Sequence, residues 1–240
     1  MIAGGGLLSS RTEIPSVASR RRFRDGAQPA RAVTHRPFEG TIEGVVLCGG
    51  RSRRMGTDKA LLADERERTL LERAASTLET ITDRVVFAVG PTERYADHLN
   101  DGRRLVVDDE AAGDGPLAGL AAALSATSAR WTVCLPVDMP GVDAELVRAL
   151  IERANETQAD LCLARGVRGV EPLLGVFGPR CADVARRLLA DGERRPVALA
   201  DPRHGLHAVE LRVEGDTRAL RNLNHPDDWQ RELSEERSDG

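Results

Sequence analysis

A basic, glycine-rich segment follows the first apolar run and has the composition of a phosphate-binding loop. It reads VVLCGGRSRRMGTDKALL over residues 45–62. The Gly49-Gly50 pair permits a sharp turn that presents backbone N–H groups to an anion. Three arginines add positive charge to the same segment: Arg51, Arg53 and Arg54. We therefore expect this segment to hold a nucleoside triphosphate, with Lys59 on its phosphates.

Lys59 is the only lysine of the chain, although the chain has 34 basic residues. A compact ammonium fits between phosphate oxygens where a planar guanidinium is a poor substitute, so a lysine retained at this place favours phosphate contact. The segment is not a Walker A loop, because the G-x4-G-K-[ST] spacing is absent and Ala60 follows the lysine, and it is not a GxGxxG fingerprint. A glycine-rich surface turn with solvated arginines is the alternative.

Two aspartates follow later apolar runs and could act beside the triphosphate. Asp138 lies between Pro136 and Pro140, which stiffen the turn around it. Mg²⁺ binds one or two carboxylates together with phosphate oxygens, so Asp138 is the expected magnesium ligand. Asp108 is a second candidate, for contact with the nucleotide. A turn-forming aspartate and a solvated acidic loop are the respective alternatives.

Apolar runs of strand length alternate with segments of helical spacing. Strands are expected at Val45–Cys48, Val85–Val89, Leu105–Val107, Trp131–Leu135, Asp160–Leu163, Leu173–Phe177 and Leu206–Val213, and helices at Leu70–Leu78, Leu117–Ala126, Val142–Ala154 and Cys181–Leu189. This alternation favours a three-layer, Rossmann-like α/β fold with a mostly parallel sheet and helices on both faces. Ligands of such folds bind at the carboxyl ends of the strands. Lys59, Asp108 and Asp138 are all expected there.

The chain is expected to form one domain over residues 41–230, because no Pro- or Ser-rich linker divides it. Residues 41–140 would be a nucleotide-binding half and 141–230 an acceptor-binding half. Residues 1–40 carry seven arginines against three acidic residues. That composition favours a disordered basic extension or an upstream start-site artefact. Residues 231–240 are expected to be a frayed acidic tail.

Composition indicates a cytoplasmic globular protein that binds neither membranes nor nucleic acid. The hydrophobic fraction is 41% and the charged fraction 30%, and no apolar run is long enough for a membrane span. Aromatic residues make up 3%, too few for the stacking platforms of single-stranded nucleic-acid binders. The four cysteines form no CxxC pair and are expected to be buried, reduced thiols: Cys48, Cys134, Cys162 and Cys181.

The phosphate-loop segment resembles the signature L-[AC]-G-G-x-S-x-R-M-G-x-D-K of the molybdenum cofactor guanylyltransferases, the MobA-type family of nucleotidyltransferases. The residues in register are Leu47, Gly49, Gly50, Ser52, Arg54, Met55, Gly56, Asp58 and Lys59. Cys48 stands where alanine is usual, and Ala88 and Gly90 stand where members often have asparagine near the base. The resemblance implies a nucleotide-diphospho-sugar transferase type of fold. It also implies a nucleotide-binding set of Leu47, Cys48, Gly49, Gly50, Arg54, Lys59, Asp108 and Asp138.

Further stretches resemble the same family over most of residues 43–229. Gly115–Gly119 is similar to its GPLAG helix start, and Cys134–Pro140 to its metal-binding aspartate strand. Arg194 and Arg195 lie in a segment similar to one near the pterin site, and residues 222–227 resemble the closing N-x-N-x-P-[ED] motif. Arg194, Arg195, Asn222 and Asn224 are therefore the implied acceptor-binding residues.

The resemblance implies transfer of GMP from GTP to molybdopterin, with Mg²⁺ as cofactor, Lys59 and Asp138 as catalytic residues, and pyrophosphate as the second product. Molybdoenzymes or their chaperones are the implied protein partners. One alternative is a related nucleotidyltransferase that uses CTP, or a cobinamide-phosphate or sugar-phosphate acceptor. The other is a non-catalytic nucleotide-binding or cofactor-delivery protein.

Overall fold

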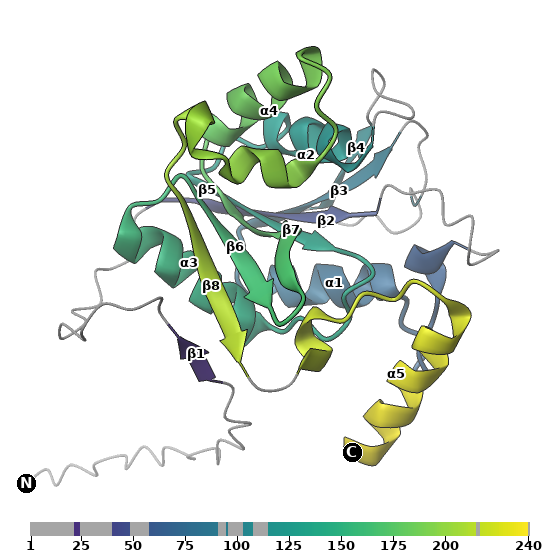
Figure 1. The fold of residues 1–240 in the computed structure, drawn as a ribbon. Helices are drawn as coiled ribbons and strands as arrows, with labels where there is room; N and C mark the ends of the chain where they lie inside the picture. The colour runs from purple at the N-terminus through teal and green to yellow at the C-terminus, as the bar shows by residue number, and fades with distance from the viewer. Residues whose placement is uncertain are drawn as a thin grey trace, which may run out of the picture.

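A computed structural model describes residues 22–24, 40–48, 58–90, 95, 103–107, 115–214 and 217–239 (Figure 1). The strands are β1 Arg22–Arg24, β2 Ile42–Leu47, β3 Arg84–Gly90, β4 Arg103–Val107, β5 Trp131–Pro136, β6 Leu161–Gly166, β7 Gly169–Phe177 and β8 Ala208–Glu214. The α-helices are α1 Leu70–Glu79, α2 Pro116–Ser125, α3 Ala144–Thr157, α4 Arg180–Ala190 and α5 Pro226–Asp239. Short 3-10 turns are η1 Lys59–Leu61, η3 Pro196–Ala200, η4 Pro202–His204 and η5 Thr217–Leu220.

The strands of the described residues form one eight-stranded sheet in the order β1-β8-β6-β7-β5-β2-β3-β4. Strands β5, β2, β3 and β4 are parallel, and β6 is parallel to β8. Strand β7 runs antiparallel to both of its neighbours, β5 and β6. Because β2, β3, β4 and β5 point the same way, their carboxyl ends meet at one edge of the sheet.

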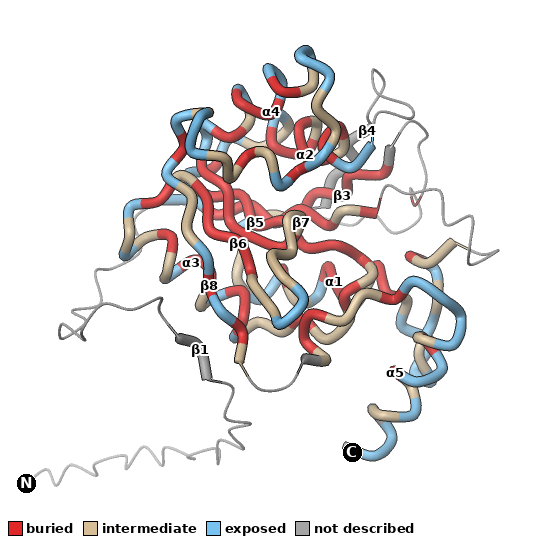
Figure 2. The backbone as a smooth tube through the Cα atoms, viewed as in Figure 1, coloured by how far each residue is buried: buried red, intermediate tan, exposed pale blue. Residues whose placement is uncertain are grey.

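Helices cover both faces of this sheet, with α1 and α3 on one side and α2 and α4 on the other (Figure 1). Consecutive residues of β2 face opposite cores: Val45 packs with α2 and Val46 with α1. Burial on both faces explains why residues 45–47 of β2 form an uninterrupted apolar run rather than an alternating one. Figure 2 shows the buried sheet between partly exposed helices. The predicted α/β class is therefore confirmed.

Local sequence signals explain where the helices begin. Thr69 and Glu72 form a reciprocal capping box at the start of α1. The Asp143 carboxylate accepts the Leu146 N–H at 2.9 Å, which makes Asp143 the N-cap of α3. Pro116 occupies the first turn of α2, where its missing N–H costs no hydrogen bond.

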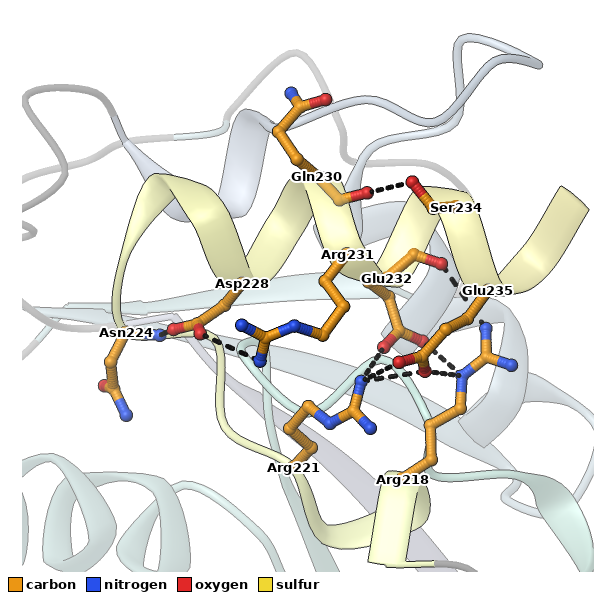
Figure 3. A network of polar contacts seen from close by, with 9 residues as sticks. All are labelled: Arg218, Arg221, Asn224, Asp228, Gln230, Arg231, Glu232, Ser234 and Glu235. Carbon is orange, nitrogen blue, oxygen red and sulfur yellow. Dashed lines mark hydrogen bonds and ion pairs between the residues drawn. The ribbon is translucent and has the colours of Figure 1, made fainter.

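The prediction of a frayed tail at 231–240 is wrong for residues 231–239, which are helical in α5. The physical reason is that two residues of α5 are buried, which its acidic composition does not indicate. Trp229 is 5% exposed and packs in the core, while Glu232 is 1% exposed. Glu232 pairs with Arg218 at 3.0 Å and with Arg221 at 3.6 Å (Figure 3).

The basic N-terminal segment is described only in part. Residues 22–24 pair antiparallel with β8 as strand β1, which departs from the expected disorder. Residues 1–21 and 25–39 lie outside the described residues. The interpretation of this segment as a disordered extension stays a prediction for them.

The four cysteines are buried and free, as expected. Burial raises the pKa of Cys162 and of Cys181 to about 12, and it raises the pKa of Cys134 as well. These three thiols are therefore protonated and unreactive at neutral pH. Within the described residues, no helix is long and apolar enough to cross a membrane.

Replacing Glu232 with alanine should destabilise the protein by about 3 kcal/mol, because it leaves two partly buried arginines without their shared buried carboxylate. Equilibrium urea unfolding measures this change. Glu235→Ala is the matched control: Glu235 pairs with the same arginines but its side chain is 35% exposed, so its loss should cost less than about 1 kcal/mol. Equal losses for the two variants would contradict the role assigned to Glu232.

Candidate active site

Lys59 opens the short turn η1 directly after Asp58. One Asp58 carboxylate oxygen accepts the Ala60 N–H at 3.1 Å, and the other accepts the Tyr95 hydroxyl at 2.5 Å. Asp58 therefore fixes the direction in which the chain enters η1, and with it the direction of the Lys59 side chain. The sequence singled out Asp58 as part of a signature but assigned it no role.

The Lys59 ammonium lies among three oxygen acceptors from distant parts of the chain. It donates to the Leu223 carbonyl oxygen, to Asp138 Oδ2 at 3.5 Å and to Asn224 Oδ1 at 3.5 Å. An ammonium has three N–H donors, and these three oxygens are the acceptors that the described residues place around it. The Lys59 side chain is only 16% exposed. We call Lys59, Asp138, Leu223 and Asn224 the lysine cluster.

Asp138 is positioned by the carboxyl end of β5. The Val137 N–H donates to the Leu47 carbonyl at 3.1 Å, which joins the turn after β5 to the end of β2. The Asp138 carbonyl accepts the Leu223 N–H at 2.9 Å, which ties the closing motif to the same turn. Leu47 thus lies at the sheet edge next to the turn that carries Asp138, and the buried Cys48 follows it, with its N–H donating to the Ala88 carbonyl at 3.0 Å.

Four predicted nucleotide-binding residues lie outside the described residues: Gly49, Gly50, Arg54 and Asp108. The glycine-rich loop and its backbone contacts therefore remain a prediction. Of that set, the structure places Leu47, Cys48, Lys59 and Asp138 at one edge of the sheet. Ala88, which replaces the family's frequent asparagine, is buried near the end of β3.

Asp138 has the properties required of a magnesium ligand. Its side chain is 26% exposed, so a bound metal ion could keep the water ligands that Mg²⁺ retains. The described residues contain no group of three or more metal-ligating side chains. A single carboxylate fits Mg²⁺ that is held chiefly by the phosphates of a bound nucleotide, and it does not fit a metal held by protein alone.

A cavity of about 600 Å³ adjoins the lysine cluster through Asn224. Its walls come from the β6–β7 hairpin, the closing motif and α5. The lining residues are Gly166, Val167, Arg168, Glu171, Val213, Leu220, Arg221, Asn222, Asn224, His225, Asp228 and Arg231. Three arginines against two carboxylates give this cavity a net positive charge, which suits an anionic ligand. The sequence analysis did not assign Arg168 or Arg231 to a site.

The four predicted acceptor-binding residues fall into two groups. Asn222 and Asn224 line the cavity, and Asn222 Nδ2 donates to Glu171 Oε2 at 3.4 Å. Arg194 lies against the start of α2 instead, where its carbonyl accepts the Leu117 N–H at 3.3 Å. Arg195 forms a fork with Glu193 at 2.8 and 3.0 Å and lowers the pKa of that carboxyl to about 2. The structure brings together the two asparagines but not the two arginines.

Comparison with known proteins agrees with this geometry. The family model described as a MobA-like NTP transferase domain matches residues 44–206. A molybdenum cofactor guanylyltransferase of Pseudomonas syringae pv. syringae is 35% identical over 183 residues, which cover 76% of this chain and 88% of the relative. A probable molybdenum cofactor guanylyltransferase of a Geobacillus species is 30% identical, over 78% of this chain and 96% of the relative.

Solved structures show the same architecture. The molybdopterin-guanine dinucleotide biosynthesis protein A of Archaeoglobus fulgidus superimposes with a TM-score of 0.67 and 25% identity, over 82% of this chain and 100% of that one. The 2-C-methyl-D-erythritol 4-phosphate cytidylyltransferase of Thermus thermophilus superimposes with a TM-score of 0.59 at 18% identity, which shows a shared fold alone. On these similarities, the chain belongs to the molybdenum cofactor guanylyltransferase family of MobA-like NTP transferases.

Proposed function

We propose that this protein transfers GMP from GTP to molybdopterin, giving molybdopterin guanine dinucleotide and pyrophosphate. The observation that carries the proposal is the lysine cluster. It joins the only lysine of the chain to a strand-end aspartate and to the closing motif, at the sheet edge where nucleotides bind in such folds. Relatives with at least 30% identity are named for this activity.

The chemistry needs charge neutralisation and alignment more than covalent help from the protein. In the proposed reaction, the terminal phosphate of molybdopterin attacks the α-phosphorus of GTP, and the bond to the bridging oxygen breaks as pyrophosphate leaves. A phosphate nucleophile is already deprotonated, so no general base is required. Lys59 would stabilise the negative charge that builds on the phosphate oxygens. Mg²⁺, held by Asp138, would neutralise further phosphate charge.

The cluster is arranged to admit a triphosphate. Among the described residues, three protein oxygens contact the Lys59 ammonium, so it would exchange at least one of them for a phosphate oxygen. The Leu223 carbonyl and the Asn224 amide are neutral, whereas the Asp138 carboxylate is charged and would also coordinate a metal ion. We expect nucleotide and metal to bind together, because the triphosphate offsets the charge repulsion between Lys59 and Mg²⁺.

We propose that molybdopterin occupies the cavity of about 600 Å³ in an acceptor-binding half formed by residues 141–230. Arg168 and Arg231 are exposed cations on its rim, and they suit the acceptor's phosphate. Asn222 and Asn224 offer amide groups to the polar edges of the pterin. Arg194 and Arg195 remain proposed acceptor contacts, although they lie on another side of the site.

Other readings fit these observations less well. The shared fold with a cytidylyltransferase means that architecture does not select the base, so a CTP-using enzyme with another acceptor is the nearest competitor. A binding-only protein would not need the lysine–aspartate pair. We further propose a cytoplasmic enzyme that hands its product to molybdoenzymes or their chaperones.

Lys59→Ala should lower kcat/KM for GTP about 100- to 1,000-fold, because it removes a preorganised charge from the developing negative charge. Lys59→Arg should recover little of the lost kcat/KM, since a planar guanidinium does not fit among the three oxygens that contact Lys59. Steady-state pyrophosphate release measures both. Arg66→Ala, an exposed cation close in sequence, is the control and should behave as wild type. Wild-type turnover by Lys59→Ala would refute the mechanism.

Among GTP, CTP, ATP and UTP, only GTP should support rapid pyrophosphate release with Mg²⁺ and molybdopterin. The measurement compares kcat/KM for the four nucleotides at equal free Mg²⁺. Preferred consumption of CTP or ATP would overturn the guanylyl assignment. Nucleotide binding without pyrophosphate release would instead indicate a binding protein.

Arg168→Ala should raise KM for molybdopterin about tenfold and leave KM for GTP within twofold, because Arg168 lines only the proposed acceptor cavity. The loss corresponds to a charge-assisted contact of roughly 1.4 kcal/mol. Arg148→Ala, which removes an exposed arginine from α3, serves as the control. An increase in KM for GTP alone would place the cavity on the nucleotide side.

A further inference from the structure

Two of the three oxygens around Lys59 come from the closing motif. They are the Leu223 carbonyl oxygen and Asn224 Oδ1. This motif is a short connection between η5 and α5, so its shape is not set by a strand or a helix. The position of the lysine ammonium therefore depends on whatever holds residues 223–225 in place.

The carboxylate of Asp228 holds this connection from the side of α5. Asp228 Oδ2 accepts the N–H of Asn224 at 2.8 Å (Figure 3). It also accepts the N–H of His225 at 2.8 Å. The Leu223 N–H is bound on the other side by the Asp138 carbonyl at 2.9 Å. Three consecutive backbone N–H groups are thus fixed, two by one carboxylate. These two hydrogen bonds lower the pKa of Asp228, so the carboxylate stays ionised at neutral pH.

The hydrogen bond from the Asn224 N–H to Asp228 exceeds what helix capping requires. Asp228 is the third residue of α5, and a carboxylate there often accepts the N–H of the residue just before the helix. His225 is that residue, so its bond to Asp228 caps the helix. Asn224 lies one residue further out, where no helical N–H needs a partner. The bond to Asn224 orients the residue whose amide oxygen contacts Lys59.

Asp228 belongs to a helix that packs tightly against the rest of the protein. Trp229 and Glu232, in the same two turns of α5, are 5% and 1% exposed. Glu232 and Glu235 pair with Arg218 and Arg221 beneath the helix (Figure 3). A carboxylate on a well-packed helix can fix the position of the neighbouring connection as closely as catalysis requires.

We propose that Asp228 is a positioning residue for the reaction: it fixes Asn224 and the Leu223 carbonyl, and through them the Lys59 ammonium. This inference rests on the proposed function, since it assumes that Lys59 acts in transfer. It assigns a catalytic consequence to α5, a helix at the opposite end of the chain from the phosphate loop. Asp228 need not touch either substrate to have this effect.

The single lysine of the chain makes a test possible without any substrate. Trace acetylation followed by peptide mass spectrometry reports the reactivity of the Lys59 amine alone, apart from the chain's N-terminus. Asp228→Ala should raise the acetylation rate of Lys59 about fivefold, because the amine loses its fixed acceptors. Asp228→Asn keeps an oxygen acceptor and should recover most of that change. Asp227→Asn removes the same charge one residue away, on an exposed side chain, and should match wild type.

Turnover supplies the second readout. Asp228→Ala should lower kcat about tenfold at a temperature well below its Tm, with KM for GTP changed less than threefold. In an Asn224→Ala background the same substitution should change kcat less than it does in the wild-type protein, because one of its two routes to Lys59, the Asn224 amide oxygen, is already lost while the Leu223 carbonyl remains. Asp228→Ser replaces Asp228→Ala if the latter does not fold.

Equal acetylation rates of Lys59 in Asp228→Ala and Asp227→Asn would overturn the inference. It would also be overturned if the loss of kcat in the double variant equalled the product of the losses in Asp228→Ala and Asn224→Ala, because the two residues would then act independently. The proposed function and the positioning role of Asp228 are tested separately. If the wild-type protein transfers no GMP, the proposed function fails, whereas the acetylation rates still decide whether Asp228 positions Lys59.

Discussion

The Lys59 ammonium and the three oxygens around it are the interaction on which the rest of the structure depends. A single positive charge joins the turn η1, the end of β5 and the motif before α5. These acceptors lie 79 to 165 positions away in sequence, so only the folded sheet can assemble them. Partial burial of the side chain limits competition from water and strengthens each contact. The Lys59 ammonium is thus held in a preformed position, where we propose that phosphate charge binds.

The parallel part of the sheet explains why the cluster forms where it does. Strands β2 and β5 are neighbours and end at the same edge, and the hydrogen bond from Val137 to Leu47 locks the two ends together. The antiparallel strand β7 then brings its hairpin partner β6 beside the closing motif, which creates the cavity next to Asn224. The proposed nucleotide and acceptor sites therefore meet at the Asn224 amide, and α5 lines the cavity through Asp228 and Arg231.

Patterns of local origin could be predicted from the sequence, and contacts of distant origin could not. The buried strands and the capped helix α3 follow from apolar periodicity and from Asp143. Helix α5 was missed because its acidic residues suggest solvent exposure, although Glu232 is buried against two arginines. Asn222 and Asn224 entered through a family resemblance rather than through spacing. Asp228 gave no sequence signal beyond that of an acid in the first turn of a helix, since its link to Lys59 exists only in three dimensions.

The central claim is that the triphosphate of the nucleotide binds at the lysine cluster. A crystal structure with a non-hydrolysable GTP analogue and Mg²⁺ tests this most directly. We predict phosphate oxygens within hydrogen-bonding distance of the Lys59 ammonium, about 2.7–3.2 Å, with the metal ion on the Asp138 carboxylate. A nucleotide bound elsewhere, with Lys59 still held only by Asp138, Leu223 and Asn224, would contradict it.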